Sequence, residues 1–195
     1  VHPSVPANTL RELIQIAQSH PGKLAYASGG IGSTPHLAGE LLKSLTKTKI
    51  VHVPYKGGAL GLVGAMSGEV DIVFTTMSGA AASYVNGGKM RGLAVLDNKR
   101  VISIPQVPSA PEAGLPDLVA VNWYVLVAPA GTPREIIDRL NAESAKIMQS
   151  AETRERFVAV GGEPTSSTPE QAAEFLRVEH ARWAKVIRDA GIKAD

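Results

Sequence analysis

A glycine-rich stretch in the segment YASGGIGSTPHLAGELL has the composition of an anion-binding loop. Its flexible and polar residues are Ser28, Gly29, Gly30, Gly32, Ser33 and Thr34. Glycine lets backbone N–H groups approach a ligand closely, and the first turn of a helix carries a partial positive charge. The stretch therefore predicts either a cradle for a carboxylate or a tight turn in which Ser33 only caps the following helix.

Two phosphate-binding motifs do not fit this loop. In a G-x-G-x-x-G fingerprint the third glycine would fall at Pro35, and no acidic residue follows at the required spacing. A phosphate loop requires Gly-Lys-Ser/Thr, which does not follow here. The pattern indicates a general anion site rather than a nucleotide site.

Other patterns that carry chemistry are incomplete. His36 and Glu40 lie one helical turn apart, but no third metal ligand is indicated, which favours a histidine satisfied by hydrogen bonds. A Ser–His–acid nucleophile requires a G-x-S-x-G turn, which the sequence lacks. Lys56 suits either an anion contact or a solvated loop. We therefore expect no catalytic residue, no metal site and no cofactor.

The elements that must position these residues alternate between strand and helix. Strands are predicted at residues 23–27, 49–55, 70–74, 90–96 and 121–129. Helices are predicted at residues 8–20, 35–45, 59–68, 78–88, 132–149, 151–159 and 168–191. This order predicts an α/β fold with a parallel sheet, interrupted by a long irregular connection over the proline-rich residues 97–120.

Composition excludes several classes of protein. A length of 195 residues suits one domain or two small ones, and 44% hydrophobic with 19% charged residues supports a folded core. A net charge of +2 without a dense Lys/Arg run argues against a nucleic-acid partner. The absence of cysteine excludes disulfides and thiol catalysis. The chain opens on VHPSVPANTL, without Met or signal-peptide features, so we expect a segment to precede it.

The chain resembles the substrate-binding proteins of tripartite tricarboxylate transporters, also called the TctC-like or Bug family. The resemblance follows the order of segments such as YASGGIGSTPHLAGELL, IVHVPYKGG, GEVDIVF, PSAPEAGLP and VLVAPAGTP over essentially the whole chain. HLAGE after the glycine stretch and VPYKG after the next strand are its most specific parts.

The resemblance implies an α/β fold of the periplasmic-binding-protein type (type II), with two lobes that close on a small organic acid. It implies a periplasmic, non-enzymatic receptor that passes its ligand to membrane permease subunits, and whose signal peptide is not present here. Residues 1–121 correspond to the complete second lobe, and residues 122–195 to the returning C-terminal part of a partial first lobe. A partial lobe is expected to expose apolar faces and to self-associate.

Carried onto this sequence, the resemblance implies a ligand site at Ser28, Gly29, Gly30, Gly32, Ser33, Thr34, Tyr55, Lys56, Gly57, Thr75 and Thr76. Many relatives carry Asp and Asn where this chain has Thr75 and Thr76. Hydroxyls cannot neutralise a buried ammonium group, and Lys56 would repel one. The expected ligand is therefore a mono- or dicarboxylate without an amine.

Two other functions fit a two-lobe α/β chain. A ligand-sensing effector domain of a transcription regulator would be preceded by a helix-turn-helix. An α/β enzyme acting on an organic acid would need a nucleophile–base pair or a metal set, which the sequence does not show.

Overall fold

The computed structural model describes residues 1–193, which divide into two compact units. The first unit is Val1–Asn122 with the stretch that begins at Lys185, and the second is Trp123–Ala184. No helix among the described residues is long and apolar enough to cross a membrane.

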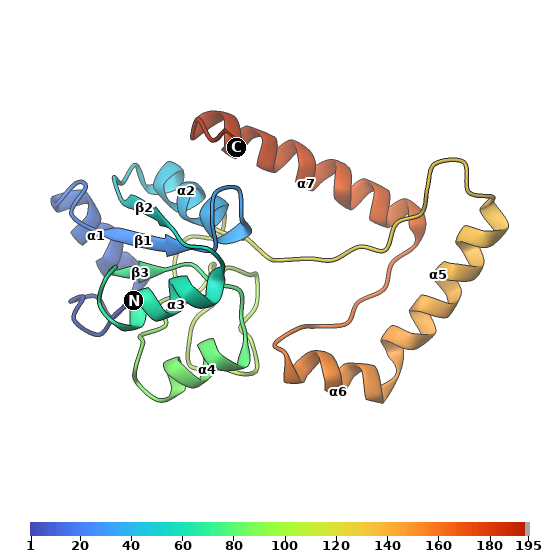
Figure 1. Ribbon diagram of the computed structural model, residues 1–195, viewed down its shortest axis with the longest axis horizontal. Helices are drawn as coiled ribbons and strands as arrows, with labels where there is room; N and C mark the ends of the chain where they lie inside the picture. The colour runs from blue at the N-terminus through green and yellow to red at the C-terminus, as the bar shows by residue number, and fades with distance from the viewer. Residues whose placement is uncertain (194–195) are drawn as a thin grey trace. The chain divides into compact units, whose positions relative to one another are not determined.

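The first unit is built on a parallel sheet with the strand order β2–β1–β3 (Figure 1). The strands are β1 (Ala25–Ser28), β2 (Val51–Pro54) and β3 (Ile72–Val73). Tyr26 of the central strand pairs with His52 on one side and with Ile72 on the other. Because all strands run the same way, the loops that leave their carboxyl ends lie at one edge of the sheet.

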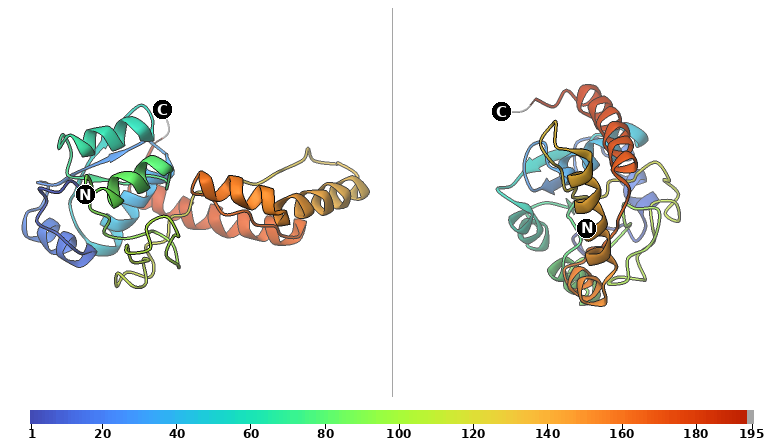
Figure 2. Two further views of the ribbon diagram at one scale, coloured as in Figure 1. Left: turned by 90° about the horizontal axis from the view of Figure 1, so that it is seen from below. Right: turned by 90° about the vertical axis from the view of Figure 1, so that its right-hand side faces the viewer.

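Helices cover both faces of this sheet (Figure 2). They are α1 (Leu10–Ser19), α2 (Thr34–Thr46), α3 (Gly58–Met66) and α4 (Gly79–Asn86). Successive residues of a strand face opposite sides, so Tyr26 packs on α2 while Ala27 packs on α3. A Cβ atom at Gly39 of α2 would lie 2.5 Å from Tyr26 Cζ, and one at Gly61 of α3 would lie 3.2 Å from the Ser28 carbonyl oxygen. Glycine at these positions lets both helices approach the sheet closely.

The connection over residues 97–120 is irregular, as predicted, but it is firmly attached. Ile104 and Val107 are buried in a cluster with Ala82 of α4. The carboxylate of Glu112 accepts hydrogen bonds from Arg100 Nε and from the Ser109 N–H, both at 2.8 Å. The connection therefore belongs to the core of the first unit.

Two predicted strands are wrong. Residues 90–96 contribute only one bridge, between Val95 and Ser109. Residues 121–129 form no strand in the described part of the chain, and Tyr124 and Leu126 are 91% and 76% exposed. The apolar pattern of both segments suits a strand, but a strand also needs a neighbour to pair with. The other three predicted strands form and are shorter at one or both ends.

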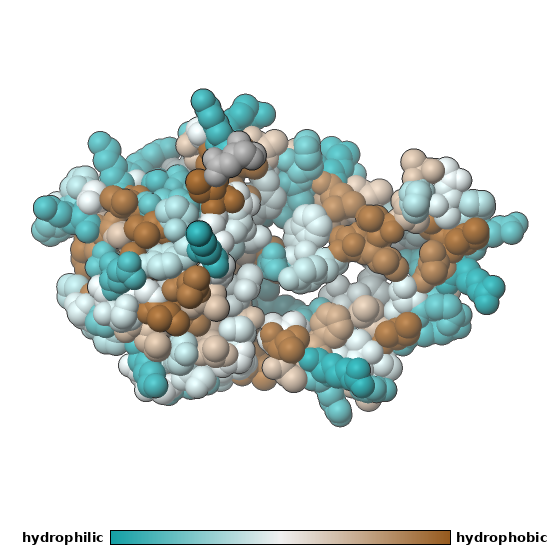
Figure 3. Space-filling view, in the orientation of Figure 1, coloured by the Kyte–Doolittle hydropathy of each residue, from teal (hydrophilic) through white to brown (hydrophobic). Residues whose placement is uncertain are grey.

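The second unit is helical and contains α5 (Arg134–Gln149), α6 (Ala151–Ala159) and most of α7 (Pro169–Asp189). A capping box starts α7, in which the Thr168 hydroxyl accepts from the Gln171 N–H at 3.2 Å and the Gln171 side chain accepts from the Thr168 N–H at 2.9 Å. No residue of these three helices is buried. Their apolar side chains lie on the surface, as the brown patches of Figure 3 show.

We predict that the chain self-associates through the exposed apolar side chains of residues 122–195, because uncovered apolar surface favours association. Light scattering should show species larger than a monomer. Leu126→Lys combined with Val127→Lys should shift the distribution toward monomer. Ile102→Lys is the matched control, since Ile102 is 85% exposed but lies in the first unit. A monodisperse wild-type monomer would contradict the prediction.

Candidate functional site

The expected site residues lie in the loops that follow the three strands of the sheet. The loops join β1 to α2, β2 to α3 and β3 to α4, and the helices begin at Thr34, Gly58 and Gly79. Helix N-termini carry unpaired N–H groups and a partial positive charge. The carboxyl edge of this sheet therefore favours an anion, at the position where open α/β sheets usually bind ligands.

The loop after β1 is held by hydrogen bonds of its own. Ser28 Oγ accepts from the Gly30 N–H at 3.1 Å, and Ser33 Oγ donates to the Gly30 carbonyl oxygen at 2.7 Å. Ser33 also caps α2 by accepting from the His36 N–H at 3.4 Å. Gly30 has φ of 127° and Gly32 has φ of 76°, which residues with a side chain rarely adopt.

These contacts decide which backbone N–H groups of the loop already have an acceptor. The N–H of Gly30 is taken by Ser28, and the N–H of Gly32 donates to His36 Nδ1 at 3.0 Å. Within residues 1–193, the N–H groups of Gly29, Ile31 and Thr34 donate to no acceptor. Ile31 was not among the expected site residues, although its backbone lies inside the predicted loop. The Thr34 hydroxyl donates to Asn122 Oδ1 at 3.2 Å.

The loop after β2 packs against the first one, backbone to backbone. The Gly57 N–H donates to the Gly29 carbonyl oxygen at 3.2 Å, and a Cβ atom on Gly29 would lie 3.1 Å from the Gly58 nitrogen. The Tyr55 N–H donates to the Ser28 carbonyl oxygen at 3.1 Å. The two glycine stretches therefore form one continuous surface.

Two expected residues of this second loop differ in what they present. The Tyr55 ring turns away from the loop and packs on the apolar cluster beneath α3, where a Cβ atom at Gly64 would lie 2.7 Å from Tyr55 Cζ. Lys56 is exposed. In the loop after β2, Tyr55 thus presents only its backbone, while Lys56 presents a charged side chain.

Thr75 and Thr76 follow β3 directly and lie in an irregular loop that leads to α4. Thr75 is half-buried and donates to the Thr76 carbonyl oxygen at 3.3 Å, and Thr76 is exposed. Their hydroxyls are uncharged, as the sequence indicated.

Next to the first loop lies a set of side chains that we call the histidine network, of which sequence reasoning connected only Ser28 with the site. Its members are Tyr26, Ser28, His36, Glu40, Lys43 and His52. The His36 and His52 rings stack with centroids 3.9 Å apart and an interplanar angle of 10°. His52 Nε2 lies 2.7 Å from Ser28 Oγ, so the network reaches the loop at two points. In the sequence, the spacing of His36 and Glu40 in HLAGE was the feature that pointed to this network.

Glu40 accepts hydrogen bonds from two other members of the network. Tyr26 Oη donates to Glu40 Oε1 at 2.8 Å, and Lys43 Nζ donates to the same oxygen at 2.7 Å. Burial lowers the pKa of His36 despite the nearby Glu40 carboxylate. Burial and the adjacent His36 lower the pKa of His52 to about 4. Both imidazoles are therefore neutral near pH 7.

The contacts of His36 and Glu40 are those of side chains satisfied by hydrogen bonds, as the sequence favoured. His36 Nδ1 already accepts from Gly32, and Glu40 is bound by Tyr26 and Lys43. Among residues 1–193, no group of three His, Asp or Glu side chains could hold a metal ion.

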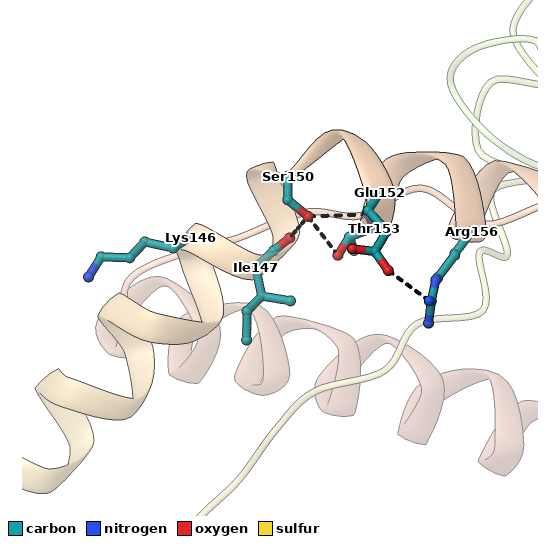
Figure 4. A pocket seen from close by; sticks show the side chains of 6 residues that line it. All are labelled: Lys146, Ile147, Ser150, Glu152, Thr153 and Arg156. Atoms are coloured by element: carbon teal, nitrogen blue, oxygen red, sulfur yellow. Dashed lines mark hydrogen bonds and ion pairs between the residues drawn. The ribbon is translucent and has the colours of Figure 1, made fainter.

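A shallow hollow of about 450 Å³ lies at the junction of α5 and α6 in the second unit (Figure 4). Ser150 lines it while capping α6, by accepting from the Thr153 N–H at 3.2 Å. Its charged lining residue Arg156 pairs with Glu152 at 2.7 Å. None of the expected site residues lies there, and its polar groups serve the ends of the two helices.

The family model described as tripartite tricarboxylate transporter family receptor (TctC) matches residues 1–192. The chain belongs to this family. It is 35% identical to the protein BugT of Bordetella pertussis (strain Tohama I), over 98% of this chain and 59% of BugT.

Solved structures extend the likeness to the fold. Rpa4515 of R. palustris with adipate has a TM-score of 0.79 and 33% identity, over 98% of this chain and 64% of the other. MatC (Rpa3494) from Rhodopseudomonas palustris with bound malate has a TM-score of 0.71 and 28% identity, over 93% of this chain and 63% of the other. This chain spans about three-fifths of the length of these relatives.

The predicted fold class is confirmed. Solved periplasmic proteins share the α/β architecture of this chain, which accounts for only about 64% of their length, so one lobe is partial. The family assignment that the HLAGE and VPYKG segments indicated is also confirmed. The relatives do not support the regulator or the enzyme alternative.

We predict that acid destabilises the fold of this chain through its neutral histidines, above all the half-buried His52. The pKa of His52 is about 4 in the folded chain and about 6.5 without the fold, so the unfolded chain binds more protons between these values. The stabilising contribution is complete above about pH 6.5 and is lost progressively as the pH falls toward 4. Urea unfolding at pH 7 and pH 5 should show a lower free energy of unfolding at pH 5.

His52→Gln is the matched variant for this measurement. Glutamine places an amide near the position of Nε2 and does not titrate in this range. The variant should lose part of the difference between pH 7 and pH 5. The same difference in both proteins would contradict the assignment to His52.

Proposed function

We propose that this chain is the ligand-binding part of an extracytoplasmic receptor that captures a small organic mono- or dicarboxylate for a tripartite tricarboxylate transporter. The observation that carries the proposal is that the N–H groups of Gly29, Ile31 and Thr34, in the loop before α2 and at its first residue, have no acceptor within residues 1–193. Relatives solved with adipate and with malate support a carboxylate as the ligand.

The chemistry of capture follows from the loop. A carboxylate oxygen accepts hydrogen bonds from backbone N–H groups, and the dipole of α2 favours its charge. Lys56 supplies a positive charge on the neighbouring rim. Thr75 and Thr76 add hydroxyl donors for a second polar group of the ligand. No covalent step is needed, and we propose that the receptor returns its ligand unchanged.

The receptor's organisation is part of the proposal. Residues 1–121 form the second lobe and residues 122–195 the returning part of the first, whose remaining part we expect to precede Val1 together with a signal peptide. Periplasmic relatives support an extracytoplasmic location. The partners are the membrane permease subunits of the transporter, and nucleic acid is not among them.

We predict that the full-length receptor prefers carboxylates without an amine. An ammonium group would meet the hydroxyls of Thr75 and Thr76 and the charge of Lys56, and a buried ammonium without a counter-charge is costly. Thermal-shift assays with succinate and aspartate compare ligands that differ by one amine. Succinate should give the larger shift, and Thr75→Asp should gain a response to aspartate. A larger shift with aspartate in the wild type would overturn the preference.

We predict that Gly32→Val abolishes adipate binding by the full-length receptor, while Gly22→Val does not. Both glycines have φ of 76° and open space where a Cβ atom would stand. A side chain in this backbone region costs roughly 1–2 kcal/mol at either position. The two variants should therefore lose similar thermal stability.

Only Gly32 lies in the proposed cradle, since Gly22 precedes β1 at the opposite edge of the sheet. Calorimetric titration with adipate should show wild-type affinity for Gly22→Val and a loss of at least about tenfold, 1.4 kcal/mol, for Gly32→Val. Equal affinities in the two variants would mean that the loop is only a turn.

A further inference from the structure

The glycine loop is held from behind by two imidazole rings that belong to different elements. His36 is in the first turn of α2, and its Nδ1 accepts the Gly32 N–H at 3.0 Å. His52 is in β2, and its Nε2 lies 2.7 Å from Ser28 Oγ. Ser28 in turn accepts the Gly30 N–H at 3.1 Å. The two histidines thus act on both halves of the loop.

The bond from Gly32 restricts the chemical state of His36. An imidazole nitrogen accepts a hydrogen bond only when it carries no proton, so the proton of a neutral His36 sits on Nε2. Nε2 lies 4.0 Å from Glu40 Oε1, which suits an N–H group on that side. A protonated His36 would present an N–H to the N–H of Gly32 and would break this contact.

The position of both rings is fixed by packing. His36 is 6% exposed, and its ring stacks on His52, which stacks on Tyr26 at a centroid distance of 4.8 Å. Tyr26 is fully buried and is held by Glu40 at 2.8 Å. Gly39 leaves room for the Tyr26 ring beside α2. Because packing holds the ring in place, His36 Nδ1 accepts the Gly32 N–H from one direction only.

We propose that His36 and His52 are positioning residues for the carboxylate site, which fix Gly32 and Ser28 so that the N–H groups of the loop that have no acceptor remain for the ligand. By taking the Gly32 N–H, His36 turns the loop so that the Gly29, Ile31 and Thr34 N–H groups stay open. Neither ring touches the ligand in this arrangement. The inference depends on the proposed function only for what the loop binds, and the positioning itself has an independent readout.

Variants of His36 separate the acceptor from the ring. His36→Asn carries Oδ1 near the position of Nδ1 and keeps an acceptor for Gly32, whereas His36→Leu keeps apolar bulk without one. His180→Leu is the control, because His180 is an exposed histidine of α7. Amide hydrogen exchange at Gly32, followed by NMR on the chain, reports the loop without any ligand. Titration of the full-length receptor with adipate and with malate reports the site.

In His36→Leu, Gly32 exchange should speed up and affinity should fall, each by at least about tenfold, the size expected for one lost hydrogen bond that orders a loop. In His36→Asn, both should stay within about threefold of wild type, and in His180→Leu both should be unchanged. Amides of Tyr26 and Ala27 should keep their protection in every variant, which shows that the sheet is intact. Unchanged Gly32 exchange and affinity in His36→Leu would overturn the proposal.

Two further outcomes remain decisive. If wild type binds neither adipate nor malate, the proposed carboxylate function is weakened, but Gly32 exchange in the variants still decides the positioning role. If His36→Leu fails to fold, the ¹⁵N chemical shift of His36 in wild type decides instead. An unprotonated Nδ1 supports the proposal, and a protonated Nδ1 overturns it, because it cannot accept from Gly32.

Discussion

The hydrogen bond from the Gly32 N–H to His36 Nδ1 joins the glycine loop to the buried side of α2 over 3.0 Å. The His36 ring stacks on His52, and His52 stacks on Tyr26. Because His52 is in β2 and Tyr26 in β1, the position of the acceptor depends on the pairing of these two strands. A loop of glycines has many conformations in water and loses them at an entropic cost. Anchoring the loop to a packed aromatic stack restricts its conformations, and we propose that this restriction lowers the cost of binding a ligand.

The glycines of the first unit serve two different physical needs. Gly30 and Gly32 supply positive φ angles that turn the chain back toward the start of α2. Gly29, Gly39 and Gly61 stand where another group comes too close for a Cβ atom, namely the second loop, the Tyr26 ring and the end of β1. A substitution of the first kind would alter the loop, whereas one of the second kind would push an element away from the sheet. Only the first kind should change binding without changing the packing of the core.

Much of this architecture was predictable from the sequence, because local rules govern it. Ser33 caps α2, as its place directly before the predicted helix indicated. The hydrogen bond of the Gly32 N–H was not predictable, because it depends on an acceptor from α2 that is stacked on a residue of β2. Residues 121–129 show the opposite case, in which a correct apolar pattern forms no strand because pairing requires a neighbour.

Local interactions alone do not account for the stability of the helices of the second unit. Exposed ion pairs such as Arg156 with Glu152, and Arg177 with Glu174, contribute little to stability, because water and salt screen their charges. Ordering a single residue costs roughly 1–2 kcal/mol, so caps and ion pairs cannot stabilise helices in which no residue is buried. The apolar side chains of α5, α6 and α7 must therefore gain their burial from a further surface. About two-fifths of the length of BugT lies outside the part that this chain matches. We infer that the remaining part of the partial lobe supplies the surface that covers these helices.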